Sequence, residues 1–175
     1  MRKKDSGGPL TYEQAKDKAL RLLEFKRRSE KELRTKLRLA GAADEDIDEI
    51  IAFCRRYKFV DDEEFARLRT ADLKNLKKYG KRRIERELYS QGIAADIVQS
   101  VLEETDFGGE EDALFPLVRK KLGGDFEKKS ADRCIRYFLY RGYEFGDIKR
   151  CIERAKEEYE EYEEYEEEYE DGDGE

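Results

Sequence analysis

Few residues of this 175-residue chain combine the types and the spacing that catalysis needs. The sequence has no histidine, which removes the commonest general base and the commonest metal ligand. The best group of carboxylates is "DDEE" at residues 61–64, which has oxygen ligands suited to a divalent cation. Acidic residues are also typical of the first turn of a helix, where they face the positive end of the helix dipole. We favour that second interpretation and predict no metal site and no catalytic residue.

Glycine pairs do not supply a nucleotide site either. The pairs that begin at residues 108 and 123 lack the Lys-Ser or Lys-Thr that follows the glycines of a phosphate-binding loop. The sequence therefore predicts a protein that is not an enzyme and that uses no cofactor.

The chemistry that the chain does offer is positive charge. The net charge is -7, but residues 157–175 hold 13 of the 44 acidic residues and no basic one. Without that tail, 37 bases face 31 acids, so residues 1–156 carry a net charge of about +6. A body of this charge attracts phosphates or acidic protein surfaces.

The bases gather in three stretches, residues 16–38, 67–86 and 119–136, which lie about 50 residues apart. We predict that the first two form a basic flank that binds DNA or a partner protein. The predicted binding residues are Arg27, Arg28, Lys31, Arg34, Lys77, Lys78, Lys81, Arg82, Arg83 and Arg86. The alternative is a solvated helix face that happens to be basic. Tyr79 and Tyr89 are candidates for stacking on exposed bases, although packing is the favoured role.

The apolar residues indicate that these stretches belong to a repeat. Counted from Ser29, Gly80 and Ser130, apolar residues stand four, eight, eighteen and twenty-two positions further on, and a glycine stands at position twelve. This pattern predicts an all-α fold, an elongated and curved array of three tandem three-helix repeats of about 50 residues each. The predicted repeats and the acidic tail are residues 10–59, 60–109, 110–156 and 157–175.

Each repeat is expected to contain a long helix, a short helix that ends at the glycine, and a third helix. The long helices are predicted at residues 11–27, 61–78 and 110–122. Three pairs have the spacing of helix-start signals, namely Thr11 with Gln14, Ser29 with Glu32, and Asp61 with Glu64. Four residues of the second long helix follow the spacing of a buried face, namely Phe65, Leu68, Leu73 and Leu76. Phe25, Leu76 and Phe126 occupy one matching position of the three repeats.

The acidic tail has two opposing features. Its tyrosines Tyr159, Tyr162, Tyr165 and Tyr169 have helical spacing and would extend the last helix. Repulsion among 13 acids opposes an isolated helix, so a solvated extension without fixed structure is favoured. A third possibility is that the tail folds against the basic flank as a nucleic-acid mimic and tunes DNA binding.

Cysteines and hydropathy indicate the compartment. Cys54, Cys134 and Cys151 are odd in number and lack CxxC spacing, so we expect buried, reduced thiols. No apolar run approaches the roughly 20 residues of a membrane span, and the start "MRKKDSGGPLTYEQ" lacks the apolar stretch of a signal peptide. The sequence predicts a cytoplasmic protein that does not associate with a membrane.

Three stretches carry a family resemblance: "RRSEKELRTKLRLAG" at residues 27–41, "VDDEEFA" at 60–66 and "YGKRRIERELYSQGI" at 79–93. In order and spacing they resemble the RecX family of bacterial recombination regulators. The match is best over residues 15–104, and the third repeat is recognisable mainly through "CIRYFLYRGYEFGDIKRCI". The resemblance implies tandem three-helix repeats that bind the groove of the RecA filament on DNA. It also implies that the protein limits strand exchange, ATP hydrolysis and filament extension, a role in recombination and DNA repair.

The expected partners are the RecA filament and single-stranded DNA, with double-stranded DNA as a further candidate, and the chain is expected to be a monomer. Two other functions remain open: a helical nucleic-acid-binding protein that does not act on RecA, and a scaffold that binds protein only. The second and third helices of each repeat loosely resemble a helix-turn-helix. The third helices, "DEDIDEIIAF" and "DIVQSVLEE", are acidic, which disfavours contact with the major groove.

Overall fold

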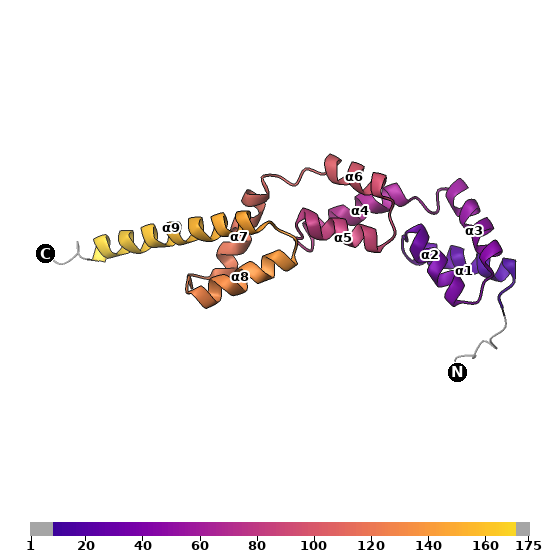
Figure 1. Ribbon diagram of the computed structural model, residues 1–175, viewed down its shortest axis with the longest axis horizontal. Helices are drawn as coiled ribbons and strands as arrows, with labels where there is room; N and C mark the ends of the chain where they lie inside the picture. The colour runs from indigo at the N-terminus through magenta and orange to yellow at the C-terminus, as the bar shows by residue number, and fades with distance from the viewer. Residues whose placement is uncertain (1–8, 171–175) are drawn as a thin grey trace, which may run out of the picture. The chain divides into compact units, whose positions relative to one another are not determined.

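The computed structural model describes residues 9–170, apart from the side chains of residues 110 and 164–170. Within that range the chain is all-α, with nine helices and no strand, as the pattern of apolar residues predicted (Figure 1). The helices are α1 (Tyr12–Phe25), α2 (Glu30–Leu39), α3 (Asp44–Arg56), α4 (Asp62–Asn75), α5 (Lys81–Ser90), α6 (Ala95–Glu104), α7 (Glu110–Leu122), α8 (Lys128–Tyr140) and α9 (Phe145–Glu170). Three helices begin within each of the three predicted repeats.

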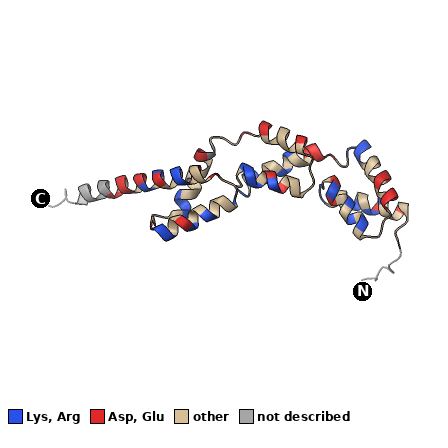
Figure 2. Cartoon of the chain, viewed as in Figure 1, with Lys and Arg blue, Asp and Glu red and all other residues tan. Residues whose placement is uncertain are grey.

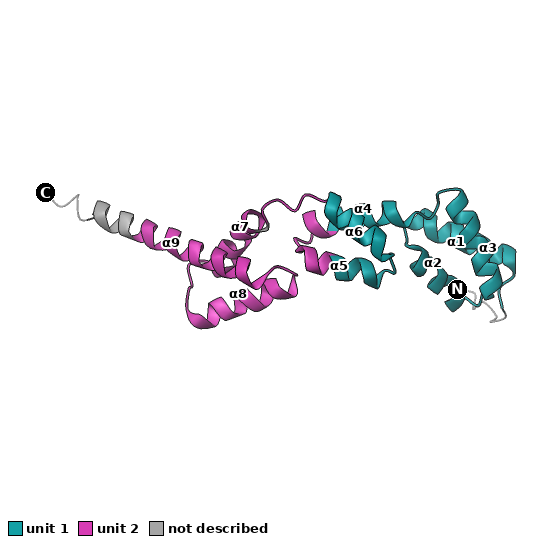
Figure 3. Cartoon of the chain, turned by 45° about the horizontal axis from the view of Figure 1, so that its top comes forward, with its two compact units in different colours: residues 1–72, 85–104 teal, residues 73–84, 105–175 magenta. Residues whose placement is uncertain are grey.

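The chain divides into two compact units (Figure 3). Unit 1 contains residues 1–72 and 85–104, and unit 2 contains residues 73–84 and 105–175. The boundaries fall inside α4 and α5, so the middle repeat contributes residues to both units. The division of the chain into three repeats therefore stays a prediction.

The predicted helix starts are confirmed by their hydrogen bonds. Thr11 and Gln14 form a complete capping box at the start of α1. The Ser29 hydroxyl accepts a hydrogen bond from the Glu32 amide at 3.1 Å, and the Asp61 carboxylate accepts one from the Glu64 amide at 3.1 Å. Each side chain satisfies an amide that has no partner inside its helix, which fixes where the helix begins.

The glycine that closes each short helix also behaves as predicted. Gly41, Gly92 and Gly142 have φ angles of 90°, 81° and 91°, in the left-handed region that a residue with a Cβ rarely adopts. The chain can therefore turn sharply from the second to the third helix of each predicted repeat.

In two of these turns, the carbonyl before the glycine accepts a hydrogen bond from the residue that precedes an earlier short helix. In unit 1, the Ser29 hydroxyl donates a hydrogen bond to the carbonyl of Gln91, the residue before Gly92, at 2.7 Å. In unit 2, the Gly80 amide donates one to the carbonyl of Arg141, the residue before Gly142, at 2.9 Å. Ser29 and Gly80 occupy matching positions of the repeat, so the same kind of junction occurs once in each unit.

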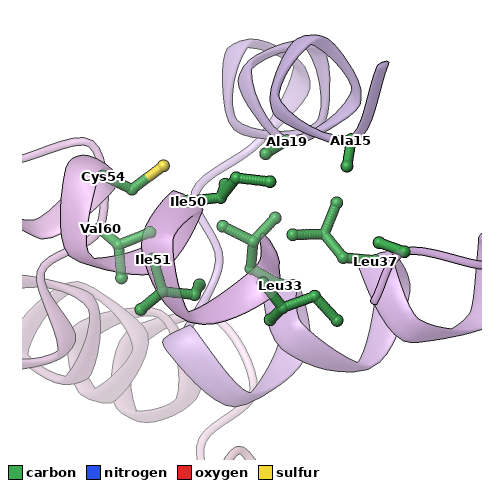
Figure 4. Close-up of a cluster of buried hydrophobic side chains, with 10 residues drawn as sticks. Ala15, Ala19, Leu33, Leu37, Ile50, Ile51, Cys54 and Val60 are labelled. Atoms are coloured by element: carbon green, nitrogen blue, oxygen red, sulfur yellow. The ribbon is translucent and has the colours of Figure 1, made fainter. Parts of the chain in front are cut away.

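The buried residues follow the predicted spacing. Unit 1 contains a cluster in which Ala15 and Ala19 of α1 face Leu33 and Leu37 of α2, with residues of α3 between them (Figure 4). Unit 2 contains a cluster built on Leu114, Val118, Cys134, Phe138, Ile148 and Cys151. Of the twelve residues predicted at positions four, eight, eighteen and twenty-two, Ile152 alone is half-buried, and the other eleven are buried.

Some predicted core positions are wrong. Leu73 is buried, but Leu68 and Leu76 are 46% and 75% exposed, and Phe25 is 84% exposed. Phe25 is the last residue of α1, and Leu76 follows the last residue of α4. At the end of a helix the side-chain direction depends on the path of the next segment, which helical spacing does not determine.

The three cysteines are buried free thiols, as predicted. Burial raises the pKa of Cys134 to about 11 and that of Cys151 to about 11, and it also raises the pKa of Cys54. A pKa raised by two units lowers the thiolate fraction at pH 8 by roughly a hundredfold.

We therefore expect iodoacetamide to alkylate Cys134 and Cys151 in the native protein at least about a hundredfold more slowly than in urea, where both pKa values return to normal. Mass spectrometry of timed samples measures this difference. Equal rates in the native and unfolded protein would show that these thiols are open to solvent.

Candidate functional site

The four predicted binding residues of the first basic stretch lie in different environments, all in unit 1. The Arg27 side chain is 64% exposed and forms a salt bridge of 2.7 Å with Glu64. Lys31 is exposed, and its stem lies against Gly92. Arg34 is only 30% exposed and is paired with Glu30 at 2.8 Å and with Asp48 at 2.5 Å. The hydrogen bonds that Arg34 donates to these two carboxylates raise its pKa, and the bond to Asp48 contributes most. Its charge is therefore largely neutralised within the unit.

Arg28 does not lie on an exposed flank, so that prediction is wrong. The residue is only 6% exposed. Its Nε donates a hydrogen bond to the Leu22 carbonyl near the end of α1 at 3.1 Å, and its guanidinium pairs with Glu32. Arg28 therefore satisfies a terminal carbonyl of α1 and holds the turn between α1 and α2, which is a structural role.

The second basic stretch presents more of its charge to solvent. Lys77, Lys78, Lys81, Arg82 and Arg86 are exposed, and α5 carries one of the clear gatherings of basic residues (Figure 2). The Arg82 guanidinium pairs with Glu144 within unit 2. Lys77, Lys78 and Lys81 make no salt bridge with a described carboxylate. These three lysines are the predicted binding residues that the structure leaves most available.

Arg83 has a packing role that the sequence did not indicate. Its guanidinium lies 5.5 Å from the Tyr79 ring and 4.8 Å from the Tyr140 ring, distances typical of cation–π contacts. Arg141 also lies against Tyr79, at 5.7 Å. Tyr79 is therefore a packing residue, as favoured, and replacing Arg83 is expected to change the fold of unit 2 as well as its charge.

A groove in unit 2 was missed as a candidate site. Seven residues line its volume of about 410 Å³: Lys78, Leu117, Lys120, Lys121, Tyr137, Phe138 and Arg141. The Lys121 ammonium lies 4.5 Å from the Tyr137 ring centre, and the Arg141 guanidinium lies 4.7 Å from it. The net positive charge of residues 119–136 was the sequence signal for this surface, but it did not show which residues converge.

The acidic tail begins within α9, the last helix of unit 2. α9 packs along α7 and continues as a helix to Glu170. The favoured prediction, an extension without fixed structure, is therefore wrong for residues 157–170, and the helical alternative is correct there. Tyr159 lies against Phe126, with ring centres 5.6 Å apart, and contacts Gly124. Tyr162 is exposed, and the predicted roles of the Tyr165 and Tyr169 side chains lie outside the described residues.

The carboxylates at residues 61–64 serve the start of α4. Asp61 caps the helix, and Asp62 accepts a hydrogen bond from the Glu30 amide at 2.8 Å. Burial raises the pKa of Asp62. Among the described side chains no group of three or more potential ligands is arranged to hold a metal ion. None of the helices described is long and apolar enough to cross a membrane.

Comparison with known proteins agrees with the motifs. Residues 15–54 match the first three-helix domain of RecX, and residues 61–102 match the second. The regulatory protein RecX of Salmonella paratyphi B is 32% identical over 152 residues, which cover 79% of this chain and 90% of that protein. The regulatory protein RecX of Cronobacter sakazakii is 34% identical over 151 residues, with the same coverage of 79% and 90%.

Solved structures show the same fold. The crystal structure of RecX from Lactobacillus salivarius aligns with a TM-score of 0.71 at 20% identity, covering 82% of this chain and 96% of that one. A second RecX crystal structure aligns with a TM-score of 0.68 at 17% identity, covering 81% and 73%. With two matched domains and relatives more than 30% identical along most of their length, the chain belongs to the RecX family of regulatory proteins.

Proposed function

We propose that this chain binds the RecA filament on DNA and limits ATP hydrolysis, strand exchange and filament extension by RecA, without catalytic activity or a cofactor of its own. The observation that carries the proposal is membership of the RecX family, because all ten residues of the predicted basic flank lie inside the two matched domains. The family name identifies regulators. The contact with RecA and its consequences are our inference for this chain.

The exposed residues indicate how such binding would occur. Lys77, Lys78 and Lys81 in unit 2, and Arg27 and Lys31 in unit 1, present positive charge beside the short helices. Such charge is suited to filament DNA phosphates or to acidic protein surface. In the sequence, the exposed apolar residue Phe25 directly precedes three basic residues, and Leu76 directly precedes two. An apolar side chain beside a charged rim is typical of a protein interface, so we infer that both RecA and DNA are contacted.

Recognition of a base sequence does not fit the third helices. The first turn of α3 contains Asp44, Glu45 and Asp46, and that of α6 contains Asp96. In a helix-turn-helix these residues would enter a groove bordered by phosphates, where negative charge is repelled. We therefore propose contacts with the phosphate backbone that do not depend on sequence.

The test is the steady-state rate of ATP hydrolysis by RecA on single-stranded DNA while this protein is added at ratios well below one per RecA. We expect the rate to fall at these low ratios, because one bound regulator affects a filament of many protomers. A fall that begins only when the protein rivals the DNA in binding sites would indicate competition for DNA. That result would favour a nucleic-acid-binding protein that does not act on RecA.

A further inference from the structure

The groove in unit 2 combines features that a simple phosphate site does not need. Four cations, Lys78, Lys120, Lys121 and Arg141, line it, and no Asp or Glu is among its lining residues. None of the four forms a salt bridge with a carboxylate whose position is described. The remaining lining residues, Leu117, Tyr137 and Phe138, form an apolar floor. A ligand that matches this surface carries several negative charges and at least one apolar side chain or ring.

A second hollow of the same unit already contains contacts between tail residues, cations and an aromatic ring. Arg119, Phe126 and Gly124 line it, together with Glu158 and Tyr159 of α9. Glu158 lies 3.7 Å from Arg119 and 3.2 Å from Arg154. The adjacent Tyr159 ring packs on Phe126 and over Gly124. An acidic residue followed by a tyrosine thus lies beside cations and an aromatic ring in the wall of this hollow.

The remainder of the tail repeats this chemistry. Residues 163–175 contain nine acidic residues, two tyrosines and no base. We propose that this segment of one copy of the chain binds the groove of Lys78, Lys120, Lys121 and Arg141 on a second copy. Its carboxylates would pair with the four cations, and a tyrosine ring would lie on the apolar floor. The protein would then self-associate, which departs from the monomer expected from the sequence.

A second copy is required because the tail cannot return to its own groove while α9 is intact. From Tyr159, which is held beside Gly124, α9 leads away from α7 and α8 for a further eleven residues (Figure 1). Those residues span about 16 Å at a rise of about 1.5 Å each. The last five residues reach at most about 17 Å when fully extended. Only the terminal residue would come back to the level of Tyr159.

The decisive test uses two variants, one without the tail segment and one with an altered groove, first separately and then as a mixture. One variant lacks residues 163–175 and keeps the groove, and the other carries Lys120→Glu and Lys121→Glu in the full chain. We expect the unaltered protein to exceed its monomer mass of 20.7 kDa in sedimentation equilibrium at low ionic strength. Each variant alone should stay monomeric, and an equimolar mixture should form heterodimers. The charge reversal should raise the dissociation constant at least about tenfold, and added salt should weaken the association.

The matched control is Lys128→Glu with Lys129→Glu. These lysines are also exposed and also lie at a helix end of unit 2, at the start of α8, whereas Lys120 and Lys121 lie in the last turn of α7. Their reversal changes the net charge by the same amount, but they do not line the groove. The control should self-associate like the unaltered protein. A monomeric unaltered protein, a full-length groove variant that still associates, or a mixture that stays monomeric would each overturn the proposal. None of these results depends on RecA, so the proposed regulatory function is tested separately.

Discussion

Replacing Gly142 by alanine is expected to lower the free energy of unfolding of unit 2 by about 3 kcal/mol or more. Gly142 has a φ angle of 91°, and a Cβ at this position would lie 2.3 Å from the Arg83 amide nitrogen and 2.6 Å from the Arg83 Cβ. These atoms belong to the backbone and the base of a side chain, so they move only if the start of α5 separates from the turn after α8. The substitution would therefore disrupt the junction between Gly80 and Arg141 as well.

Gly123→Ala is the matched control within the same unit. Gly123 also has a positive φ angle, 58°, but a Cβ there would meet no atom within 4 Å. Its cost is the left-handed backbone alone, about 1 kcal/mol. Urea unfolding followed by circular dichroism compares the two variants. Equal losses would show that the close approach between Gly142 and Arg83 is absent in solution.

Reversing the charge of Lys77 and Lys81 together is expected to weaken binding to the RecA filament by about a hundredfold, because attraction becomes repulsion at two exposed positions. Both lysines are exposed, and neither is paired with a described carboxylate, so helical content should not change. They are better test positions than Arg82, Arg83 and Arg86 together, since Arg83 packs between Tyr79 and Tyr140. Fluorescence anisotropy with labelled filaments measures the affinity.

The control for this variant is Lys128→Glu with Lys129→Glu, which changes the net charge equally at two exposed positions of α8, outside the predicted basic flank. Its affinity should fall much less. The salt dependence then separates the two kinds of contact, because each lost phosphate contact lowers the slope of log affinity against log salt by about one. Unchanged affinity after the Lys77 and Lys81 reversal would remove these lysines from the interface.

One residue predicted for the basic flank, Arg28, is buried, and the reason is geometric. Arg27 and Arg28 are neighbours in the sequence, yet one is exposed and the other is buried against the Leu22 carbonyl. Both residues lie in the segment between α1 and α2, where no helical period sets the direction of a side chain. The path of the chain between the two helices therefore decides which of them is covered. Composition identifies a basic stretch, but it cannot tell a binding residue from a capping one.

Local patterns in the sequence were sufficient to predict the features that depend on residues a few positions apart. Capping pairs, closing glycines and the spacing of most buried residues follow from local patterns, and the structure agrees with them. Contacts between side chains from distant positions became visible only in the folded chain. Packing brings Lys78, Lys120 and Arg141 to one groove, places Arg83 against the turn at Gly142, and leaves Phe25 exposed. Such contacts depend on how whole helices pack, which no local spacing specifies.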